Sequence, residues 1–558
     1  MLSKLFSIDD ARLNHRQAAS LSLLLLLLTA ILYLPLLDQP PFTNEEPRRA
    51  LVAQSMIASG DYWVPIVRDE IYTAKPPLYN WLIVVANQPD KAIDTYRTRL
   101  ISLVSLVLLT VSMVFGFRRH LPAHGLVFLG LAIALAPELA SKALIAEIDA
   151  IFTLLVTLSI WAWFWLDTRG KRGLGLWLAP ALLVGLAFLT KREPALVFYY
   201  LSIGGYLLFQ RRLRELLLWP HLLSALVMLA MIGFWLWKMI DAVGLEAFVA
   251  STLEEVVTRG TGGGLTDFLS HFLLYPLHIL AAMLPFSLLL LPLVNRPVRE
   301  GLMQRYPEIF RFAVIAVLFN LPPYLFRDGL SVRYFMPMMP TMLVIAALVY
   351  DFLVTDSSAL AQTWRKVITR VVGILSLVLA FCVNLLLFPE QLGLAEKPVD
   401  LLPVPLVYLL SAAALIMALM LLKVSWQQSR RYLMISLVCM MLVLRVLYLD
   451  ILLPHRTAKL KLGEDFPGLA ATILETVPPG SLPVRTYGPV PNPLWFHMGY
   501  GNLVTAPKAA AAGLGAPGYI VGYRWVLEQL RADGMQTDEL AHIIFEDQDL
   551  VFARVRRD

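Results

Sequence analysis

Two adjacent carboxylates and several cations follow the first hydrophobic stretch of the chain. Glu45 and Glu46 come first, Arg48 and Arg49 follow, and Lys75 lies further along. A carboxylate can act as a general base, and guanidinium or ammonium groups bind phosphate by charge-assisted hydrogen bonds. The group is therefore suited to holding a phosphate while a neighbouring hydroxyl is deprotonated. The structural alternative is an interfacial helix with acidic residues at its N-terminus and arginines at lipid headgroups.

The composition decides the class of protein in which this group must be placed. The chain has 558 residues, of which 58% are hydrophobic and 16% charged, and its mean hydropathy is +0.66. Apolar runs of about 20 residues recur along it, which is the length of a transmembrane helix. The net charge of +6 comes from short basic clusters between these runs, so it does not indicate a nucleic-acid partner. The sequence therefore predicts a multi-pass membrane protein.

The first apolar run is too long for a signal-peptide core, so we expect a retained anchor. In all, about thirteen transmembrane helices are expected. Their predicted ranges are 20–37, 99–117, 125–144, 150–166, 176–189, 195–209, 216–240, 275–294, 312–326, 335–352, 371–388, 403–422 and 432–453. Basic clusters occupy alternate connections, for example Arg118 with Arg119 and Arg211 with Arg212. The positive-inside rule then predicts a cytoplasmic N-terminus and an outer C-terminus in a bacterial inner membrane.

The predicted topology divides the chain into two domains. Residues 1–453 form the all-α transmembrane domain, with interfacial helices in the first periplasmic loop, 44–98, and a mobile periplasmic loop at 241–274. The second of these loops contains three consecutive glycines, which favour mobility. Beyond residue 453 the hydropathy falls, and short apolar runs alternate with turns. Residues 454–558 are therefore predicted to form a small α/β periplasmic domain.

No cofactor is predicted to be required. The chain lacks a phosphate-binding glycine loop, and its two cysteines, Cys382 and Cys439, lie in apolar runs typical of buried thiols. His271 and His278 are seven residues apart and could share a helix face, so a divalent metal is the alternative.

Nucleotide sugars are absent from the outer side of the membrane, and a transferase there must therefore use a sugar already carried on lipid.

Four further patches extend the pattern of the first loop. They are Asp149 at the start of the fourth predicted helix, Thr190-Lys191-Arg192-Glu193-Pro194, the pair Glu255 and Arg259, and Arg333-Tyr334 before Pro337. Together with Ser59-Gly60-Asp61-Tyr62 and Lys75-Pro76-Pro77, they make the chain resemble the GT-C membrane glycosyltransferases that use polyprenyl-phosphate sugars. The resemblance is to the branch of the lipid A aminoarabinose transferase and the protein O-mannosyltransferases.

The chain departs from that family at several positions. Glu45 replaces the usual Asp, Arg49 replaces an aromatic residue, Tyr72 lies further from Lys75, and Val256 stands where a His usually follows the Glu. These changes argue against aminoarabinose and lipid A as the substrates, but leave the reaction class unchanged.

The resemblance implies inverting transfer of a hexose or pentose from an undecaprenyl-phosphate-linked donor. The acceptor would be a periplasmic-side molecule: a lipid A-like lipid, a glycan or a protein. Glu45 is expected to be the general base, with Glu46 as the alternative, and Asp149 to orient a substrate. The donor phosphate would be bound by Arg48, Tyr72, Lys75, Lys191, Arg259, Arg333 and Tyr334, while Glu255 and His271 are further candidates.

The alternative function is a transporter or flippase of lipid-linked sugars, using these cations only for binding.

Overall fold

A computed structural model describes residues 11–38, 42, 45–88, 92–258, 264–327, 329–385, 412–413, 415–416, 418–420, 423, 432–445, 465–506, 518–546 and 548–557. The chain forms two compact units. The first, here called the helical unit, comprises Met1–Gln39, Arg99–Trp237 and Val249–Pro454. The second, here called the mixed unit, comprises Pro40–Thr98, Lys238–Phe248 and His455–Asp558. The predicted boundary after residue 453 stays a prediction.

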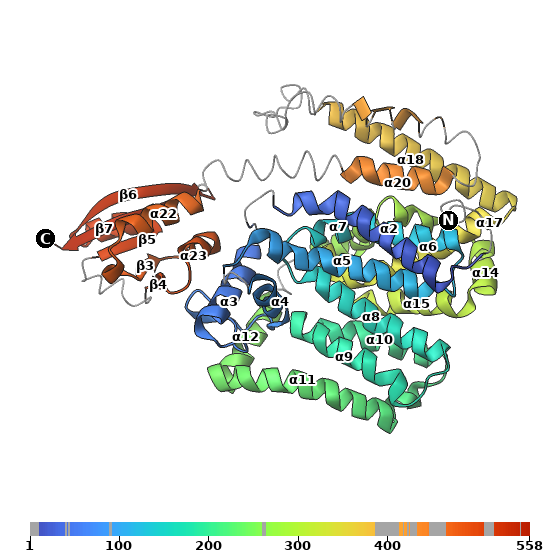
Figure 1. Cartoon of the computed structure of the whole chain (residues 1–558), viewed down its shortest axis with the longest axis horizontal. Coiled ribbons are helices and arrows are strands. Elements are labelled where there is room, and N and C mark those ends of the chain that lie inside the picture. The colour runs from blue at the N-terminus through green and yellow to red at the C-terminus, as the bar shows by residue number, and fades with distance from the viewer. Residues whose placement is uncertain are drawn as a thin grey trace. The chain divides into compact units, whose positions relative to one another are not determined.

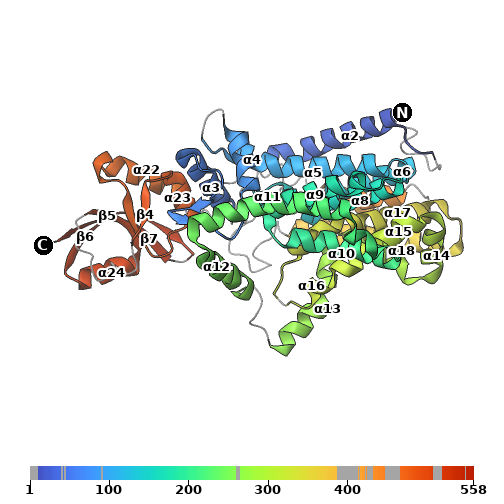
Figure 2. The same cartoon turned by 90° about the horizontal axis from the view of Figure 1, so that it is seen from below.

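The helical unit is built from long apolar helices, which Figures 1 and 2 show in two views. Its principal helices are α2 His15–Tyr33, α5 Thr95–Phe117, α6 Ala123–Leu135, α7 Pro137–Ala143, α8 Asp149–Thr168, α9 Leu174–Lys191, α10 Pro194–Phe209, α11 Trp219–Val243, α12 Leu245–Thr258, α13 Leu265–Ala281, α14 Arg296–Arg305, α15 Pro307–Asn320, α17 Met339–Thr355, α18 Ala359–Leu385 and α20 Tyr432–Arg445. In the described residues, seven helices are long and apolar enough to cross a membrane, or eight if the bent pair α6 and α7 is one span. The predicted all-α membrane architecture is confirmed, whereas the predicted number of thirteen stays a prediction.

Two prolines begin helices where the chain changes direction. Pro137 begins α7 after the 54° bend that separates it from α6. Pro194 begins α10, because its fixed φ suits the first helical turn and its missing N–H leaves no donor unpaired there. Most of the predicted mobile loop at 241–274 is helical, since α12 and α13 cover much of it. The twelfth predicted span, 403–422, lies largely outside the described residues.

Ion pairs and buried carboxylates lie at the ends of several spans. At the end of α8, Asp167 pairs with Arg172 at 2.9 Å and with Arg212 at 2.7 Å. At the end of α17, Asp351 accepts a hydrogen bond of 2.8 Å from the Tyr306 hydroxyl, and His124 lies 2.8 Å from it. These clusters lie at the ends where the basic connections occur. The opposite ends of α8, α9 and α17 carry the residues described in the next subsection.

The mixed unit joins two segments that are far apart in the sequence. The first segment contains α3 Glu46–Ser59, the hairpin β1 Ile66–Val67 and β2 Glu70–Ile71, and α4 Leu78–Asn87. It contacts the C-terminal segment through polar groups: Arg68 Nε donates to Asn492 Oδ1 at 3.1 Å, and Asp69 accepts from the Thr505 hydroxyl at 2.8 Å. The first predicted loop and the C-terminal segment therefore fold as one unit.

The C-terminal segment is an α/β fold, as predicted. Its five strands are β3 Val484–Tyr487, β4 Leu503–Thr505, β5 Gly518–Tyr523, β6 Met535–Phe545 and β7 Gln548–Arg557, in the order β4-β3-β5-β7-β6. β4, β3 and β5 are parallel, and β5, β7 and β6 are antiparallel. The helix α24 Arg524–Ala532 covers one face, where Leu527 and Leu530 pack on Ile520 and Val551. The other helices of the segment are α22 Phe466–Thr476 and α23 Asn492–Met498.

We expect Gly205→Ala to destabilise the helical unit, because α10 and α15 approach closely there. A Cβ at Gly205 would lie 2.8 Å from the Phe319 ring and 3.1 Å from Ile315, whereas a Cβ at Gly204 meets nothing within 4 Å. Overpacking of this kind costs roughly 1–3 kcal/mol. Gly204→Ala, on the same helix, is the matched control and should not lower the thermal unfolding temperature in detergent. Equal unfolding temperatures for the two variants would contradict the packing of α10 on α15.

Candidate active site

In the helical unit, a buried ion pair joins the start of α8 to the end of α9. Lys191 Nζ donates to Asp149 Oδ1, and these side chains are only 8% and 6% exposed. The Lys191 ammonium also lies 4.8 Å from the centroid of the Tyr334 ring and 5.5 Å from that of Phe152. One carboxylate and two aromatic faces therefore surround this ammonium. The predicted residues Asp149, Lys191 and Tyr334 are brought together by three different spans.

A second carboxylate adjoins this pair. Glu147, two residues before Asp149, accepts a hydrogen bond of 2.9 Å from Lys142 Nζ and lies 3.5 Å from Arg333 Nη1. Burial raises the pKa of the Glu147 carboxyl above its ordinary value, while the Lys142 ammonium acts in the opposite direction. Arg333 also lies over the Tyr334 ring at 5.4 Å. Glu147 thereby holds Arg333 near the predicted group.

The turn after Lys191 adopts an unusual backbone conformation. Arg192 ends α9 with φ 66° and ψ −138°, a region that L-residues rarely occupy. Such a conformation costs on the order of 1–3 kcal/mol and persists only where the surroundings enforce it. The Arg192 side chain is fixed on both sides, pairing with Glu193 at 2.9 Å and donating to Thr252 Oγ1 at 3.2 Å. These contacts set the direction in which α9 ends, and therefore the position of Lys191.

In the mixed unit, the predicted residues of the first loop gather at the start of α3. Arg48 pairs with Glu45 at 2.7 Å one helical turn away, and the Glu45 side chain is 37% exposed. Glu46, by contrast, is completely buried. The Tyr72 ring lies beneath both arginines, 5.8 Å from the Arg48 guanidinium and 5.7 Å from that of Arg49. The neighbouring carboxylates are thus in different environments, one accessible and one enclosed.

The β1–β2 hairpin and the turn before α4 place the remaining groups of this loop. The Tyr72 N–H donates to the Pro65 carbonyl at 2.7 Å, which closes the chain around the hairpin. Lys75 is buried and donates to the Ala74 carbonyl at 3.1 Å. It lies at the Lys-Pro-Pro turn that leads into α4. Asn80 on α4 donates to the Arg49 carbonyl at 2.8 Å and so fixes α4 to α3.

Arg49 is the feature of this loop that the sequence did not reveal. The residue is 4% exposed, yet its Nε and Nη1 have no hydrogen-bond partner in the described part of the chain. A buried guanidinium without an acceptor is costly, and buried polar groups in folded proteins are almost always satisfied. Arg49 therefore indicates that an anion or water belongs beside it. The sequence showed it as one of the cations of this loop, in the place of an aromatic residue, but not among the predicted phosphate-binding residues.

Other predicted residues are placed elsewhere or cannot be placed. His271 Nε2 donates to the Tyr324 carbonyl at 2.9 Å and the ring packs on Tyr275, so these contacts account for its polar group. Arg259 and the side chain of Glu255 lie outside the described residues. Glu147 and Lys142 complete the helical-unit cluster but were not among the predicted site residues.

No group of three or more His, Cys, Asp and Glu side chains is placed to hold a metal in the described residues, and metal independence stays a prediction.

Comparison with known proteins gives partial sequence similarity. Residues 74–237 match the family model described as dolichyl-phosphate-mannose-protein mannosyltransferase. The undecaprenyl phosphate-alpha-4-amino-4-deoxy-L-arabinose arabinosyl transferase of Pseudomonas aeruginosa (strain LESB58) is 32% identical over 211 residues, which are 37% of each protein. Transferase 1 of that name from Pseudomonas fluorescens (strain Pf0-1) is 26% identical over 331 residues, 57% of this chain and 56% of the relative. The alignments thus span about a third to a half of these relatives.

Similarity of the fold extends over nearly the whole chain. ArnT from Cupriavidus metallidurans superposes with a TM-score of 0.70 in the apo state, at 17% identity, covering 96% of this chain and 98% of that one. The structure of the same protein bound to undecaprenyl phosphate gives a TM-score of 0.68 at 18% identity, with the same coverage. The resemblance predicted from the sequence is confirmed, and the chain is a helical membrane protein with the fold of ArnT.

A double-mutant cycle should reveal strong coupling between Asp149 and Lys191. Lys191→Met leaves a buried carboxylate uncompensated, which typically costs about 3–5 kcal/mol of unfolding free energy. Adding Asp149→Asn should restore part of that loss, so the double variant should be more stable than the sum of the single losses predicts. Thermal unfolding in detergent measures the stability of the two single variants and of the double variant.

The matched control is the exposed ion pair of Arg296 and Glu300 on α14. Arg296 Nε and Glu300 Oε1 lie 2.7 Å apart. Arg296→Met and Glu300→Gln should show little coupling, because solvent screens an exposed pair. Additive losses for Asp149 and Lys191, as for the control, would contradict a buried ion pair.

Proposed function

We propose that this protein is an inverting glycosyltransferase that takes a sugar from an undecaprenyl-phosphate-linked donor. The buried, unsatisfied guanidinium of Arg49 beside the Glu45–Arg48 pair is the observation that carries the proposal. The Arg49 guanidinium can bind an anion, and the accessible Glu45 carboxylate lies one helical turn away. The names of the relatives, which are transferases acting on undecaprenyl phosphate-linked aminoarabinose, support the same reaction class.

Glu45 is the proposed general base. The acceptor hydroxyl oxygen attacks the anomeric carbon as the bond from that carbon to the phosphate oxygen breaks. The hydroxyl proton passes to Glu45, and the electron pair of the broken bond leaves with polyprenyl phosphate. The accessibility of Glu45 favours this role over Glu46, which is buried. Arg48, at 2.7 Å, restricts the rotamers of the Glu45 side chain and so orients the base.

The leaving phosphate needs cations, because negative charge grows on it as the bond breaks. In the mixed unit, Arg49 and Lys75 are buried cations, and the guanidinium groups of Arg48 and Arg49 both lie over the Tyr72 ring. In the helical unit, Lys191 and Arg333 are cations beside Tyr334, and their binding of the donor phosphate stays a prediction.

Asp149 would position Lys191, and Arg259 would complete the phosphate-binding group. The reaction as proposed requires no metal, because the cations of the chain take up the charge of the leaving group.

The reaction is proposed to take place on the periplasmic side of a bacterial inner membrane, with the N-terminus in the cytoplasm. The charge distribution supports this orientation, since the arginines near Asp167 and Asp351 lie at the ends opposite Asp149 and Lys191. The acceptor would be an outer-leaflet lipid, a glycan or a protein.

The alternative function, a flippase of lipid-linked sugars, would use polar groups within the spans. Two such groups that the sequence contains have partners in the protein. Asn320 donates to Ser202 at 2.8 Å, and Arg445 donates to the Leu32 carbonyl at 2.8 Å. Both therefore serve helix packing, and the transferase is the better supported function.

We expect Glu45→Gln to lower turnover by roughly a hundredfold, since the amide keeps the shape of the side chain but cannot accept the proton. Donor binding and the unfolding temperature should change little. Glu70→Gln removes a carboxylate from the exposed strand β2 and serves as the control. Transfer of radiolabelled sugar from a polyprenyl-phosphate donor to an envelope extract is the measurement. Retained activity in Glu45→Gln, together with a folded but inactive Glu46→Gln, would move the base by one residue.

Proteoliposomes with lipid-linked sugar in both leaflets distinguish a transferase from a flippase. A transferase should consume only the donor in the leaflet facing Glu45, and release polyprenyl phosphate there without ATP or an ion gradient. An envelope extract supplied on that side provides the acceptor. Intact donor equilibrating between leaflets, with no polyprenyl phosphate formed, would overturn the proposed reaction.

A further inference from the structure

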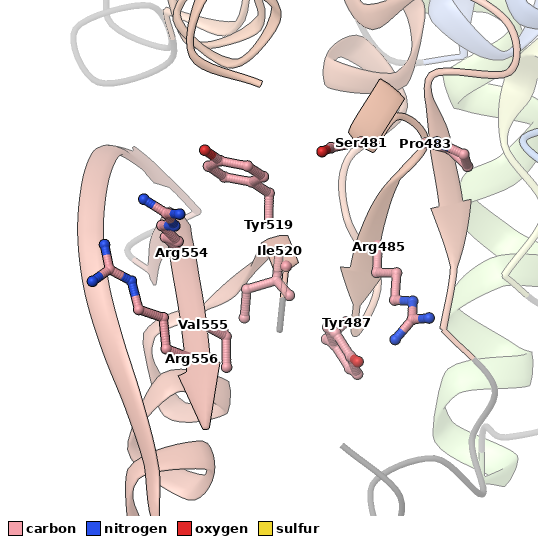
Figure 3. A pocket seen from close by; sticks show the side chains of 10 residues that line it. Ser481, Pro483, Arg485, Tyr487, Tyr519, Ile520, Arg554, Val555 and Arg556 are labelled. Carbon is pink, nitrogen blue, oxygen red and sulfur yellow. The ribbon is translucent and has the colours of Figure 1, made fainter. Parts of the chain in front are cut away.

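A cavity of about 380 Å³ lies at one end of the C-terminal sheet, within the mixed unit (Figure 3). It is found where β3 and β5 begin and β7 ends. Its polar lining side chains are Ser481, Arg485, Tyr487, Tyr519, Arg554 and Arg556. None of the described residues that line it carries a carboxylate. We call this cavity the arginine pocket.

The arginines of the pocket come from two strands and are held by aromatic rings. Figure 3 shows Arg554 and Arg556 on β7 at one side, and Arg485 with Tyr487 on β3 at the other. The Arg554 guanidinium lies 5.8 Å from the centroid of the Tyr519 ring. Arg485 lies beside Tyr487 on β3, and its positive charge opposes the burial that raises the pKa of the Tyr487 hydroxyl. These contacts restrict two long side chains before any ligand arrives.

The positive charge of the pocket is only weakly neutralised. Arg556 lies 3.5 Å from Asp538 on β6, a pair in which both side chains are more than half exposed. Such a pair is screened by solvent and contributes little. Neither Arg485 nor Arg554 forms an ion pair in the part of the chain that the structure describes. At least two guanidinium groups are thus available to an anion.

The chemistry of the lining favours one class of ligand. Guanidinium groups bind phosphate through paired hydrogen bonds, more specifically than ammonium groups do. Tyrosines add hydroxyl groups and flat apolar faces, which suit a sugar ring that has both polar edges and C–H faces. The volume lies within the range of small-ligand sites, about 300–1,000 Å³. A nucleic acid would require an extended track of basic residues rather than one localised group of arginines.

We propose that the arginine pocket binds a phosphorylated saccharide through its phosphate group. The ligand could be a soluble phosphosugar or the phosphorylated sugar headgroup of a lipid, and both present the same chemistry. Identification of this ligand as the acceptor of the transfer rests on the proposed function, whereas binding itself does not. In that case the pocket would recognise the acceptor at a place distinct from Glu45 and Arg49.

The test uses the full chain in phosphatidylcholine nanodiscs, titrated with glucosamine 1-phosphate by calorimetry. Saturable binding is expected, with glucosamine itself binding far more weakly. Arg485→Gln and Arg554→Gln should each raise the Kd about tenfold, the effect of losing one charge-assisted hydrogen bond. Arg485→Lys, which keeps the charge, should restore part of the affinity. Arg531→Gln removes an arginine from α24 that does not line the pocket and should leave the Kd unchanged.

A second arm identifies the source of the phosphosugar. The full chain in detergent micelles is mixed with phosphatidylcholine vesicles, with or without a phosphorylated diglucosamine lipid, and vesicle association is measured. Binding in either arm that depends on Arg485 and Arg554 supports the pocket. Failure of the wild type to bind in both arms, or equal binding by the wild type and both glutamine variants, overturns it. A protein that binds the phosphosugar but transfers no sugar in proteoliposomes would disprove only the transferase.

Discussion

The buried ion pair between Asp149 and Lys191 is the interaction on which the helical unit's site depends. A charge at the end of a membrane span is stable only with a partner of opposite charge. Asp149 and Lys191 are each other's partners. Their positions at the start of α8 and the end of α9 mean that the pair also fixes the two helices against each other. Tyr334 and Arg333 come from the segment before α17, so a third span is tied to the same point. The same ion pair therefore determines both how these helices pack and how the residues of the site are arranged.

A different constraint governs the mixed unit, where the first loop is held by a segment more than four hundred residues away. Arg68 and Asp69, in and beside the β1–β2 hairpin, contact Asn492 and Thr505. The Arg68 guanidinium also lies 6.0 Å from the Trp495 ring, and burial lowers its pKa below the ordinary value. The hairpin in turn holds Tyr72 beneath the arginines of α3. The C-terminal sheet can therefore influence the candidate base without supplying any reacting group.

Much of the fold could be predicted from the sequence, because apolar length and charge clusters act locally. The end of α9 and the start of α10 at Pro194 follow from chain-local rules of this kind. The packing of the first loop on the C-terminal segment could not be predicted in that way. Its contacts depend on which polar groups meet after folding, and neither Asp69 nor Thr505 is distinctive in sequence. The role of Glu147 was hidden for the same reason, since only folding brings Lys142 and Arg333 to it.

The two arginines of α3 show most clearly why residue type alone does not assign a role. Arg48 and Arg49 are adjacent, share the Tyr72 ring and have the same chemistry, yet among the described residues only Arg48 has a carboxylate partner. Successive helical residues point about 100° apart, so one guanidinium reaches back to Glu45 while the other enters the interior. Arg48 restricts the Glu45 carboxylate, which is the proposed base, whereas Arg49 is enclosed with its Nε and Nη1 unsatisfied in the described residues. The proposed reaction requires both a carboxylate that accepts a proton and a cation that binds a phosphate, and a single turn of helix provides these two environments.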